Sequence, residues 1–401
     1  MTRIIPIAAA PEVHSEPRFT ALPPLSLYVH IPWCVKKCPY CDFNSHEAKN
    51  AIPEAEYVAA LIADLESALP HIWNRPVHSV FFGGGTPSLL SVNAVDTLLA
   101  AFRARLPLAP TAEITLEANP GTVEADKFAG FRAAGVNRVS LGIQSFDDAK
   151  LQALGRIHGS DEAKRAIDLA LKHFDQVNID LMYALPRQSL DEARRDLETG
   201  IAFGTPHLSA YHLTLEPNTP YAHHPPPLPD DDAAADMQDM VEETLAGAGY
   251  EHYETSAYAK PGNACFHNMN YWTFGDYLGI GAGAHGKITS SAPGTESPVV
   301  REMRRKHPKD YLAGAARGDF VQERRFVTTE ELPFEFLMNA LRLTEGFAVT
   351  QFEERSGLPI AVAQDHLRQA QQENLLTIAE WKIVPTLQGR RFLNRLLGIF
   401  L

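Results

Sequence analysis

Short apolar runs alternate with longer segments of helical periodicity from residue 25 onward, and this alternation constrains the fold most. The apolar runs lie at 25–31, 78–82, 113–117, 138–143, 177–183 and 208–215. The helical segments lie at 54–69, 92–106, 123–134, 163–174 and 190–203. Six buried strands, five of them followed by helices, indicate an α/β fold with a parallel sheet. Right-handed crossovers wind such a sheet into an open or partial barrel, with the site at the C-terminal ends of the strands.

The second half of the chain breaks this alternation. A proline- and acid-rich connection at 221–232 precedes a predicted helix at 233–248 and a tyrosine-rich strand at 252–258. Residues 290–298 look like a flexible excursion. From about residue 328, helices at 332–343, 349–356 and 359–373 and a β-like stretch at 376–386 resemble a winged-helix module. We therefore predict a flexible tail at 1–22, a barrel with an extension at 23–300, and a mainly helical C-terminal domain at 301–401.

Composition narrows the classes of function. With 401 residues, 45% of them hydrophobic, the chain can bury a sizeable core. The net charge of −13 disfavours a nucleic-acid partner, and no apolar run approaches the ~20 residues of a membrane span. Three of the four cysteines lie within eight residues, which does not suit a disulfide scaffold. Free thiols fit a reducing compartment, so we expect a cytoplasmic protein.

Those three cysteines stand in the segment LYVHIPWCVKKCPYCDFN, as Cys34, Cys38 and Cys41. Thiolates spaced C-x3-C-x2-C can hold one face of a [4Fe–4S] cluster, and the lack of a fourth nearby cysteine leaves one iron open. The spacing is similar to the radical S-adenosylmethionine (SAM) signature, in which SAM occupies the open iron and is cleaved to a radical. The alternative is a zinc site completed by His30 or His46.

Polar residues follow successive predicted strands and suggest a pocket for SAM. The glycines of FGGGTP, at 82–87, would let the backbone approach a ligand closely. Glu117, Gln144 and Asp180 end or lie within later strands, and Arg156 follows twelve residues after Gln144. Each of these side chains alone could equally be a structural ion pair or a cap. Their recurrence at neighbouring strands favours a shared pocket.

Several motifs together resemble the coproporphyrinogen III oxidase-like radical SAM family, from about Ser26 to the C-terminus. They are YVHIPWC, CPYCDFN, FFGGGTPS, GIQSF, NIDLMYALP and GIGAGAHG. The resemblance implies a partial (β/α)6 barrel with a small, mainly helical C-terminal domain. It implies that Cys34, Cys38 and Cys41 ligate the cluster. The SAM contacts that it implies are Tyr28, Gly84, Gly85, Thr86, Glu117, Gln144, Arg156 and Asp180.

Three features favour the heme-chaperone branch of that family over its oxidase branch. The oxidase carries a further cysteine where this chain has Phe43, and a longer region before the cluster motif, where this chain has 33 residues. The segment HNMNY matches the HNxxY motif that the resemblance associates with heme binding. The resemblance therefore implies heme as a further cofactor, with His267, Asn268 and Tyr271 as its site.

The HNxxY residues also have a physical interpretation of their own. Imidazole and phenolate are both axial ligands of heme iron, and a helix would place His267 and Tyr271 on one face. Trp272, Phe274 and Tyr277 could supply aromatic surface for a porphyrin. Spacing alone favours an ordinary histidine beside an aromatic core, and the family resemblance reverses that preference.

Three functions are open at this stage. The leading hypothesis is a chaperone that binds heme and delivers it to apo-hemoproteins, respiratory ones by expectation, with cluster-dependent dimerisation and peripheral membrane contact during delivery. The alternative is an oxygen-independent coproporphyrinogen III oxidase, which decarboxylates two propionates by radical chemistry. A radical SAM enzyme on another substrate is the third. The sequence identifies neither the electron donor nor whether SAM is consumed.

Overall fold

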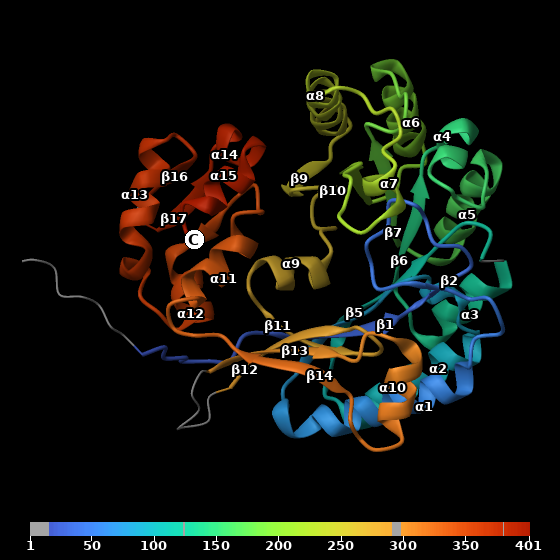
Figure 1. Cartoon of the computed structure of the whole chain (residues 1–401), viewed down its shortest axis with the longest axis horizontal. Coiled ribbons are helices and arrows are strands. Elements are labelled where there is room, and N and C mark those ends of the chain that lie inside the picture. The colour runs from blue at the N-terminus through green and yellow to red at the C-terminus, as the bar shows by residue number, and fades with distance from the viewer. Residues whose placement is uncertain (1–15, 123–124, 291–297, 380) are drawn as a thin grey trace, which may run out of the picture.

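The computed structural model describes residues 16–122, 125–290, 298–379 and 381–401. A 12-stranded sheet dominates it, in the order β14-β13-β12-β11-β1-β4-β5-β6-β7-β8-β10-β9 (Figure 1). Its six central strands run parallel to one another. They are β1 (Leu25–Ile31), β4 (Val77–Gly84), β5 (Leu108–Ala118), β6 (Arg138–Gln144), β7 (Gln176–Tyr183) and β8 (His207–His212). The predicted α/β fold with six parallel strands is confirmed.

Helices cover the outer face of this sheet, as the alternation predicts. They are α1 (Glu54–Ala68), α2 (Val92–Arg105), α3 (Ala125–Ala134), α5 (Ser160–His173) and α6 (Leu190–Ala202), followed by α8 (Asp231–Gly247). Apolar side chains such as Leu61 and Leu98 are fully buried against the strands. Ser91 and Ser189 begin α2 and α6 by accepting a backbone N–H three residues ahead. Positions 123 and 124 of the third predicted helix lie outside the described residues.

Further strands extend the sheet at both edges, and the sequence pattern did not predict most of them. Next to β1, β11 (Asp276–Ile280) adds a seventh parallel strand, and the antiparallel strands β12 (His285–Thr289), β13 (Val299–Arg304) and β14 (Val321–Phe326) follow it. At the other edge the single predicted strand at 252–258 is two strands, β9 (Glu251–Glu254) and β10 (Ala257–Ala259), paired antiparallel. The predicted excursion at 290–298 falls mostly at 291–297, outside the described residues. Because β13 and β14 belong to the large sheet, we propose that the C-terminal unit begins near residue 327.

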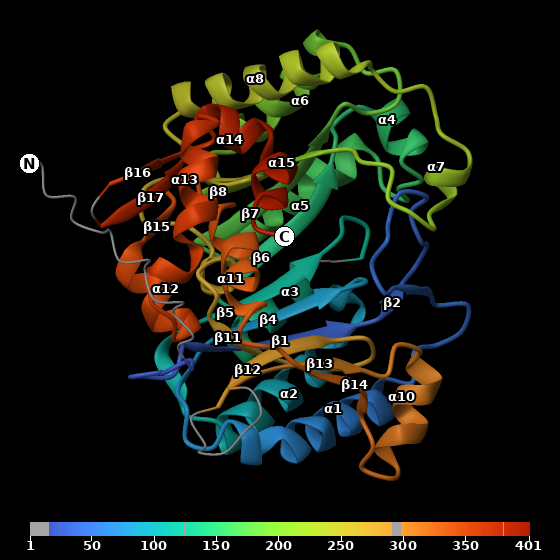
Figure 2. The same cartoon turned by 60° about the vertical axis from the view of Figure 1, so that its left-hand side comes forward.

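The C-terminal unit has its own core and a three-stranded sheet (Figure 2). Its elements are α11 (Leu332–Ala340), β15 (Phe347–Ala348), α12 (Val349–Ser356), α13 (Gln364–Gln372), β16 (Leu376–Ile378), β17 (Lys382–Pro385), α14 (Leu387–Arg391) and α15 (Leu393–Gly398). Phe336 packs edge-on against both Phe347 and Phe352. Part of the predicted tail is attached here, since the Arg18 N–H donates to Gly357 O. Every helix of the described residues is too short or too polar to span a bilayer.

Candidate functional site

The three clustered cysteines lie at the C-terminal ends of the parallel strands. Cys34 ends the short strand β2 (Trp33–Cys34), and Cys38 and Cys41 lie on the loop that leads to β3 (His46–Glu47). All three line one cavity of about 500 Å³, which we call the cluster cavity. Seven of the eight predicted SAM contacts line it as well: Gly84, Gly85, Thr86, Glu117, Gln144, Arg156 and Asp180. Tyr28, the eighth, lines the adjoining cavity described below.

The donor set suits a three-cysteine cluster better than a zinc ion. Within the described residues no three Cys, His, Asp or Glu side chains converge as ligands of a single metal ion. His30 has both ring nitrogens engaged: Nδ1 accepts from the Tyr28 hydroxyl at 3.0 Å, and Nε2–H donates to Asn44 O at 2.9 Å. Thiols that share a cavity without meeting at one point match a cubane, whose irons are spread over its corners.

Two positions of the FGGGTP turn must be glycine because neighbouring atoms lie too close for a Cβ atom. Gly84 has a φ of +112°, and a Cβ there would lie 2.5 Å from Cε1 of the His30 ring. A Cβ on Gly85 would lie 2.5 Å from the Trp33 carbonyl oxygen, and the Gly85 N–H already donates to Ile31 O at 2.7 Å. The turn therefore lies directly against the backbone that carries the first cysteine, which places the predicted SAM cradle beside the cluster ligands.

Glu117 and Asp180 are half-buried carboxyl groups at the inner end of the cluster cavity. Burial, with the nearby Asp180 charge, raises the pKa of Glu117 to about 8, although its Oε2 accepts the Gly84 N–H at 3.2 Å. Burial also raises the pKa of Asp180, against hydrogen bonds from Asn178 and Ser140. A cationic ligand group would favour the ionised forms of both, and SAM carries an ammonium and a sulfonium.

Arg156 connects the cluster ligands to the strand ends. Its Nη1 donates to Cys38 Sγ at 3.6 Å, and its Nη2 donates to Gly142 O at 2.7 Å and to Asn119 Oδ1. Asn119 in turn donates to Thr86 Oγ1 at 2.9 Å. Sequence reasoning missed Asn119, although it stands two residues after Glu117 in the LEANP motif, because an amide at a strand end carries no signal of its partners.

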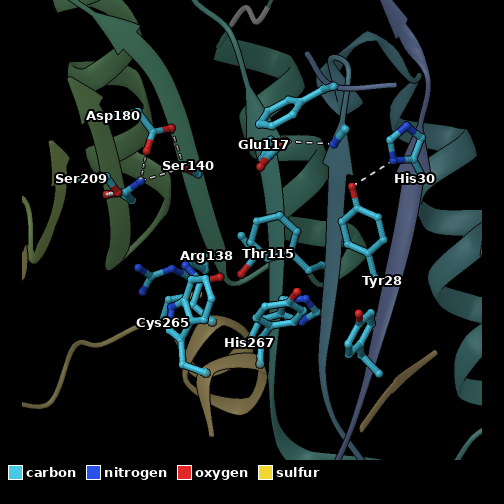
Figure 3. A pocket seen from close by; sticks show the side chains of 18 of the residues that line it. Tyr28, His30, Thr115, Glu117, Arg138, Ser140, Asp180, Ser209, Cys265 and His267 are labelled. Carbon is cyan, nitrogen blue, oxygen red and sulfur yellow. Dashed lines mark hydrogen bonds between the residues drawn. The ribbon is translucent and has the colours of Figure 1, made fainter. Parts of the chain in front are cut away.

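A second cavity of about 630 Å³ continues inward along the concave face of the barrel (Figure 3). We call it the lumen cavity. Phe43, Gly84, Glu117, Ser140, Asp180 and Tyr211 line both cavities, so the two adjoin. Strand alternation explains its polar wall: on each strand the intervening residues, such as Leu116 and Val139, enter the apolar core. The polar residues that line it from the strands include Tyr28, His30, Thr115, Glu117, Arg138, Ser140, Asn178, Asp180, His207 and Ser209.

Helix α9 (Phe266–Trp272) forms the floor of the lumen cavity and contains the HNxxY residues. Ser79 donates its hydroxyl proton to Ser26, at 2.8 Å, so its oxygen accepts from His267 Nδ1–H, at 3.0 Å. That tautomer leaves the lone pair of His267 Nε2, which has no hydrogen-bond partner in the part of the chain that the structure describes, free to bind a ligand. Burial lowers the pKa of His267 to about 3, so the ring is neutral. The Phe81 and Tyr28 rings lie 4.8 and 6.3 Å from it.

The structure brings most of the neighbouring candidates to the same cavity. Asn268 and Tyr271 line it, as do Trp272 and Tyr277. The expectation for Phe274 was wrong: its ring is buried in the core of the C-terminal unit, 5.8 Å from Phe336, because the chain turns at Phe274 with a φ of +58°. Helical spacing could predict that His267 and Tyr271 lie together. It could not predict that Phe274, which follows the end of the helix, packs in the core of the C-terminal unit.

The fold and the site define the class of this protein. Residues 28–199 match the radical SAM superfamily, and residues 327–392 match the HemN C-terminal domain. The fold is that of the solved coproporphyrinogen III oxidase HemN of Escherichia coli, described as a radical SAM enzyme, with a TM-score of 0.80. That match covers 94% of this chain and 90% of the other, at 23% sequence identity, and shows the fold alone. The class is therefore a radical SAM protein with a HemN-type C-terminal domain.

Comparison with relatives of similar sequence identifies the family within this class. It is 51% identical over 386 residues to the heme chaperone HemW of Escherichia coli, which covers 95% of this chain and 99% of the relative. It is 49% identical over 390 residues to the heme chaperone HemW of Haemophilus influenzae, which covers 95% and 98%. The chain therefore belongs to the HemW family of the radical SAM superfamily. Membership of the superfamily implies a [4Fe–4S] cluster and SAM as cofactors.

Proposed function

We propose that this protein binds heme in the lumen cavity and delivers it to apo-hemoproteins. The observation that carries the proposal is the neutral His267 imidazole, held through Nδ1 by Ser79 with Nε2 free. A neutral imidazole nitrogen is a common axial ligand of heme iron. The aromatic rings of Phe81, Tyr271 and Trp272 line the same cavity and offer apolar surface to a macrocycle. The two HemW relatives, named heme chaperones, support this assignment.

The cofactor residues follow from the same proposal. Cys34, Cys38 and Cys41 would ligate the cluster. SAM would contact the residues of the cluster cavity, namely Gly84, Gly85, Thr86, Glu117, Gln144, Arg156 and Asp180. Tyr28 would contact SAM from the adjoining lumen cavity. When bound, the cluster supplies an electron that can cleave the SAM sulfonium. The chain itself positions the ligand: the Gly84–Gly85 turn admits its backbone contacts, Arg156 holds Cys38, and Glu117 with Asp180 favours a cation.

The oxidase alternative has weaker support in this chain. The solved HemN shares the fold at 23% identity, which does not carry its activity over. Phe43 stands where the oxidase branch has a further cysteine, and its side chain is 61% exposed at the rim of both cavities. We expect no decarboxylated porphyrinogen after incubation with coproporphyrinogen III, SAM and a reductant. Product formation coupled to SAM cleavage would instead establish the oxidase.

The remaining partner predictions rest on the chaperone proposal. The recipients are expected to be respiratory apo-hemoproteins, and delivery is expected to involve a homodimer at the membrane surface. Sedimentation of the cluster-free and cluster-loaded protein, with and without hemin, would test the dimer. Binding to liposomes would test the peripheral location.

The binding proposal is tested by an anaerobic hemin titration of the cluster-loaded protein, followed by its visible spectrum. His267→Ala removes the axial ligand, and His71→Ala, an exposed histidine outside both cavities, is the matched control. We expect saturable binding by the wild type and by His71→Ala. His267→Ala should bind roughly tenfold or more weakly, a loss of about 1.4 kcal/mol or more, with a changed Soret band. Equal titrations of all three proteins would remove His267 from the heme site.

A further inference from the structure

The floor of the lumen cavity holds a buried guanidinium with few protein acceptors. The Arg138 side chain is 3% exposed and lines this cavity (Figure 3). Its hydrogen bonds come from Nη1 and are long: 3.4 Å to Gln176 Oε1 and 3.5 Å to Asn263 O. A guanidinium has five N–H donors, and within the described ranges no acceptor pairs with its Nε or Nη2. Buried donors without acceptors are costly, so the arrangement favours a ligand that accepts hydrogen bonds and carries negative charge.

Arg138 forms a long ion pair with Glu113. Glu113 Oε2 lies 3.9 Å from Arg138 Nη1, too far for a hydrogen bond. The Glu113 carboxylate is already engaged, because its two oxygens accept the backbone N–H groups of Phe266 and His267 at 3.1 and 3.0 Å, and the Cys265 thiol at 3.4 Å. Glu113 therefore holds the start of α9 and leaves Arg138 with part of its donor capacity unused.

A polar group without a hydrogen-bond partner among the described residues lies beside Arg138. In the parallel pairing of β5 and β6, Thr115 is the register partner of Arg138. Thr115 is 1% exposed, lines the lumen cavity, and its hydroxyl oxygen has no hydrogen-bond partner among the residues described. A guanidinium and a hydroxyl that line one cavity from neighbouring strands suit a carboxylate, the planar anion that arginine recognises best.

We propose that Arg138 and Thr115 form a subsite for a propionate carboxylate of the porphyrin whose iron His267 binds. This inference rests on the proposed function and adds the orientation of the ligand. Glu113 contacts the His267 backbone and stands two residues before Thr115 on β5, so the subsite and the axial ligand share the cavity floor. The carboxylate edge of the porphyrin then faces β5 and β6, and its apolar edge faces the rings of Tyr28 and Phe81.

The test compares hemin with hemin dimethyl ester, which lacks both carboxylates. The proteins are the wild type, Arg138→Gln, Thr115→Val, and Arg165→Gln as a matched control on the exposed face of α5. Arg138→Gln should lose about tenfold or more in hemin affinity, the scale of one charge-assisted hydrogen bond, and Thr115→Val should lose less. Neither should move the Soret band, since His267 is intact. The dimethyl ester should bind the wild type and Arg138→Gln alike.

The possible outcomes distinguish the carboxylate subsite from heme binding itself. If Arg138→Gln loses hemin and ester affinity equally, the subsite is wrong although heme binding stands. If the wild type binds neither form, the proposed function falls. SAM also carries a carboxylate, so SAM affinity is measured in parallel: a loss of SAM affinity in Arg138→Gln with unchanged hemin affinity would assign the subsite to the amino acid and overturn the proposal. Should Arg138→Gln not fold, the wild type alone must still prefer hemin to its more apolar ester.

Discussion

Glu117 shows how one side chain serves binding at a cost to stability. It stands where the two cavities adjoin, and burial raises its pKa to about 8, against about 4.5 in an unfolded chain. Between these two pH values the folded state binds more protons than the unfolded state. The stabilising effect of protonated Glu117 is therefore complete below pH 4.5 and is lost as the pH rises towards 8. A neutral residue at this position would relieve the cost, but it would lose the charge that favours a cationic ligand.

The substitution Glu117→Gln should accordingly stabilise the cofactor-free protein in a pH-dependent way. Glutamine keeps an oxygen for the Gly84 N–H, so the local hydrogen bond survives. We expect a gain of about 1–3 kcal/mol at pH 7.5 and almost none at pH 4.5. Urea unfolding of both proteins at both pH values measures the difference. An equal effect at the two pH values would show that Glu117 is not an acid with a raised pKa.

The same carboxylate predicts a pH dependence of SAM binding. Because a cationic ligand favours ionised Glu117, SAM affinity should rise as the pH increases from 6.5 to 8.5. Equilibrium dialysis of SAM against cluster-loaded protein gives this slope. In Glu117→Gln the slope should flatten and the affinity should fall. A slope that the substitution leaves unchanged would place the titrating group elsewhere.

At the scale of residues, the sequence predicted the functional residues that lie in short motifs. It did not predict the residues that become neighbours only through the pairing of strands. The cysteines, the glycine turn and the HNxxY residues are recognisable as short patterns. Thr115 and Arg138 are 23 positions apart, and only the pairing of β5 with β6 makes them neighbours. Asn119 and Ser79 were also missed, because each acts by holding another functional side chain.

At the scale of elements, the turn after β4 sets the position of the cluster ligands. Gly85→Ala would push a Cβ to within 2.5 Å of the Trp33 carbonyl, so the backbone beside Cys34 must move. We expect a loss of about 1–3 kcal/mol in stability and a lower iron and sulfide content after reconstitution. Gly247→Ala, in α8 with nothing near its Cβ position, is the matched control and should keep full cluster content. Normal cluster loading in Gly85→Ala would contradict this tight packing.

Elements with strong periodicity were predictable, and those defined by pairing were not. The helices of the barrel and α12 match their predicted ranges within a few residues because an apolar stripe marks them. β13 and β14 carry many charged residues, as in VVREMR and VQERRF, and hydrogen bonding to neighbouring strands rather than an apolar sequence pattern makes them strands. The turn between β9 and β10 has no glycine or proline to mark it.

At the scale of the molecule, two adjoining cavities connect the two halves of the proposed function. The cluster cavity lies at the C-terminal ends of the strands, and the lumen cavity ends at α9, which contacts the C-terminal unit through Arg342 over the Trp272 ring at 5.2 Å. A ligand on His267 would thus lie between the SAM site and the C-terminal unit. The sequence predicted both parts of this site but not their junction, which depends on how the barrel closes around α9.

The most direct test of the central claim is transfer of bound heme. Cluster-loaded protein carrying one hemin is mixed anaerobically with an apo-form of a b-type cytochrome, and the Soret change is followed at several acceptor concentrations. We predict a transfer rate that rises with acceptor concentration, because the donor hands heme over within a complex, and no such transfer from His267→Ala. A rate that is independent of acceptor concentration would mean that heme simply dissociates into solution, and would contradict a chaperone.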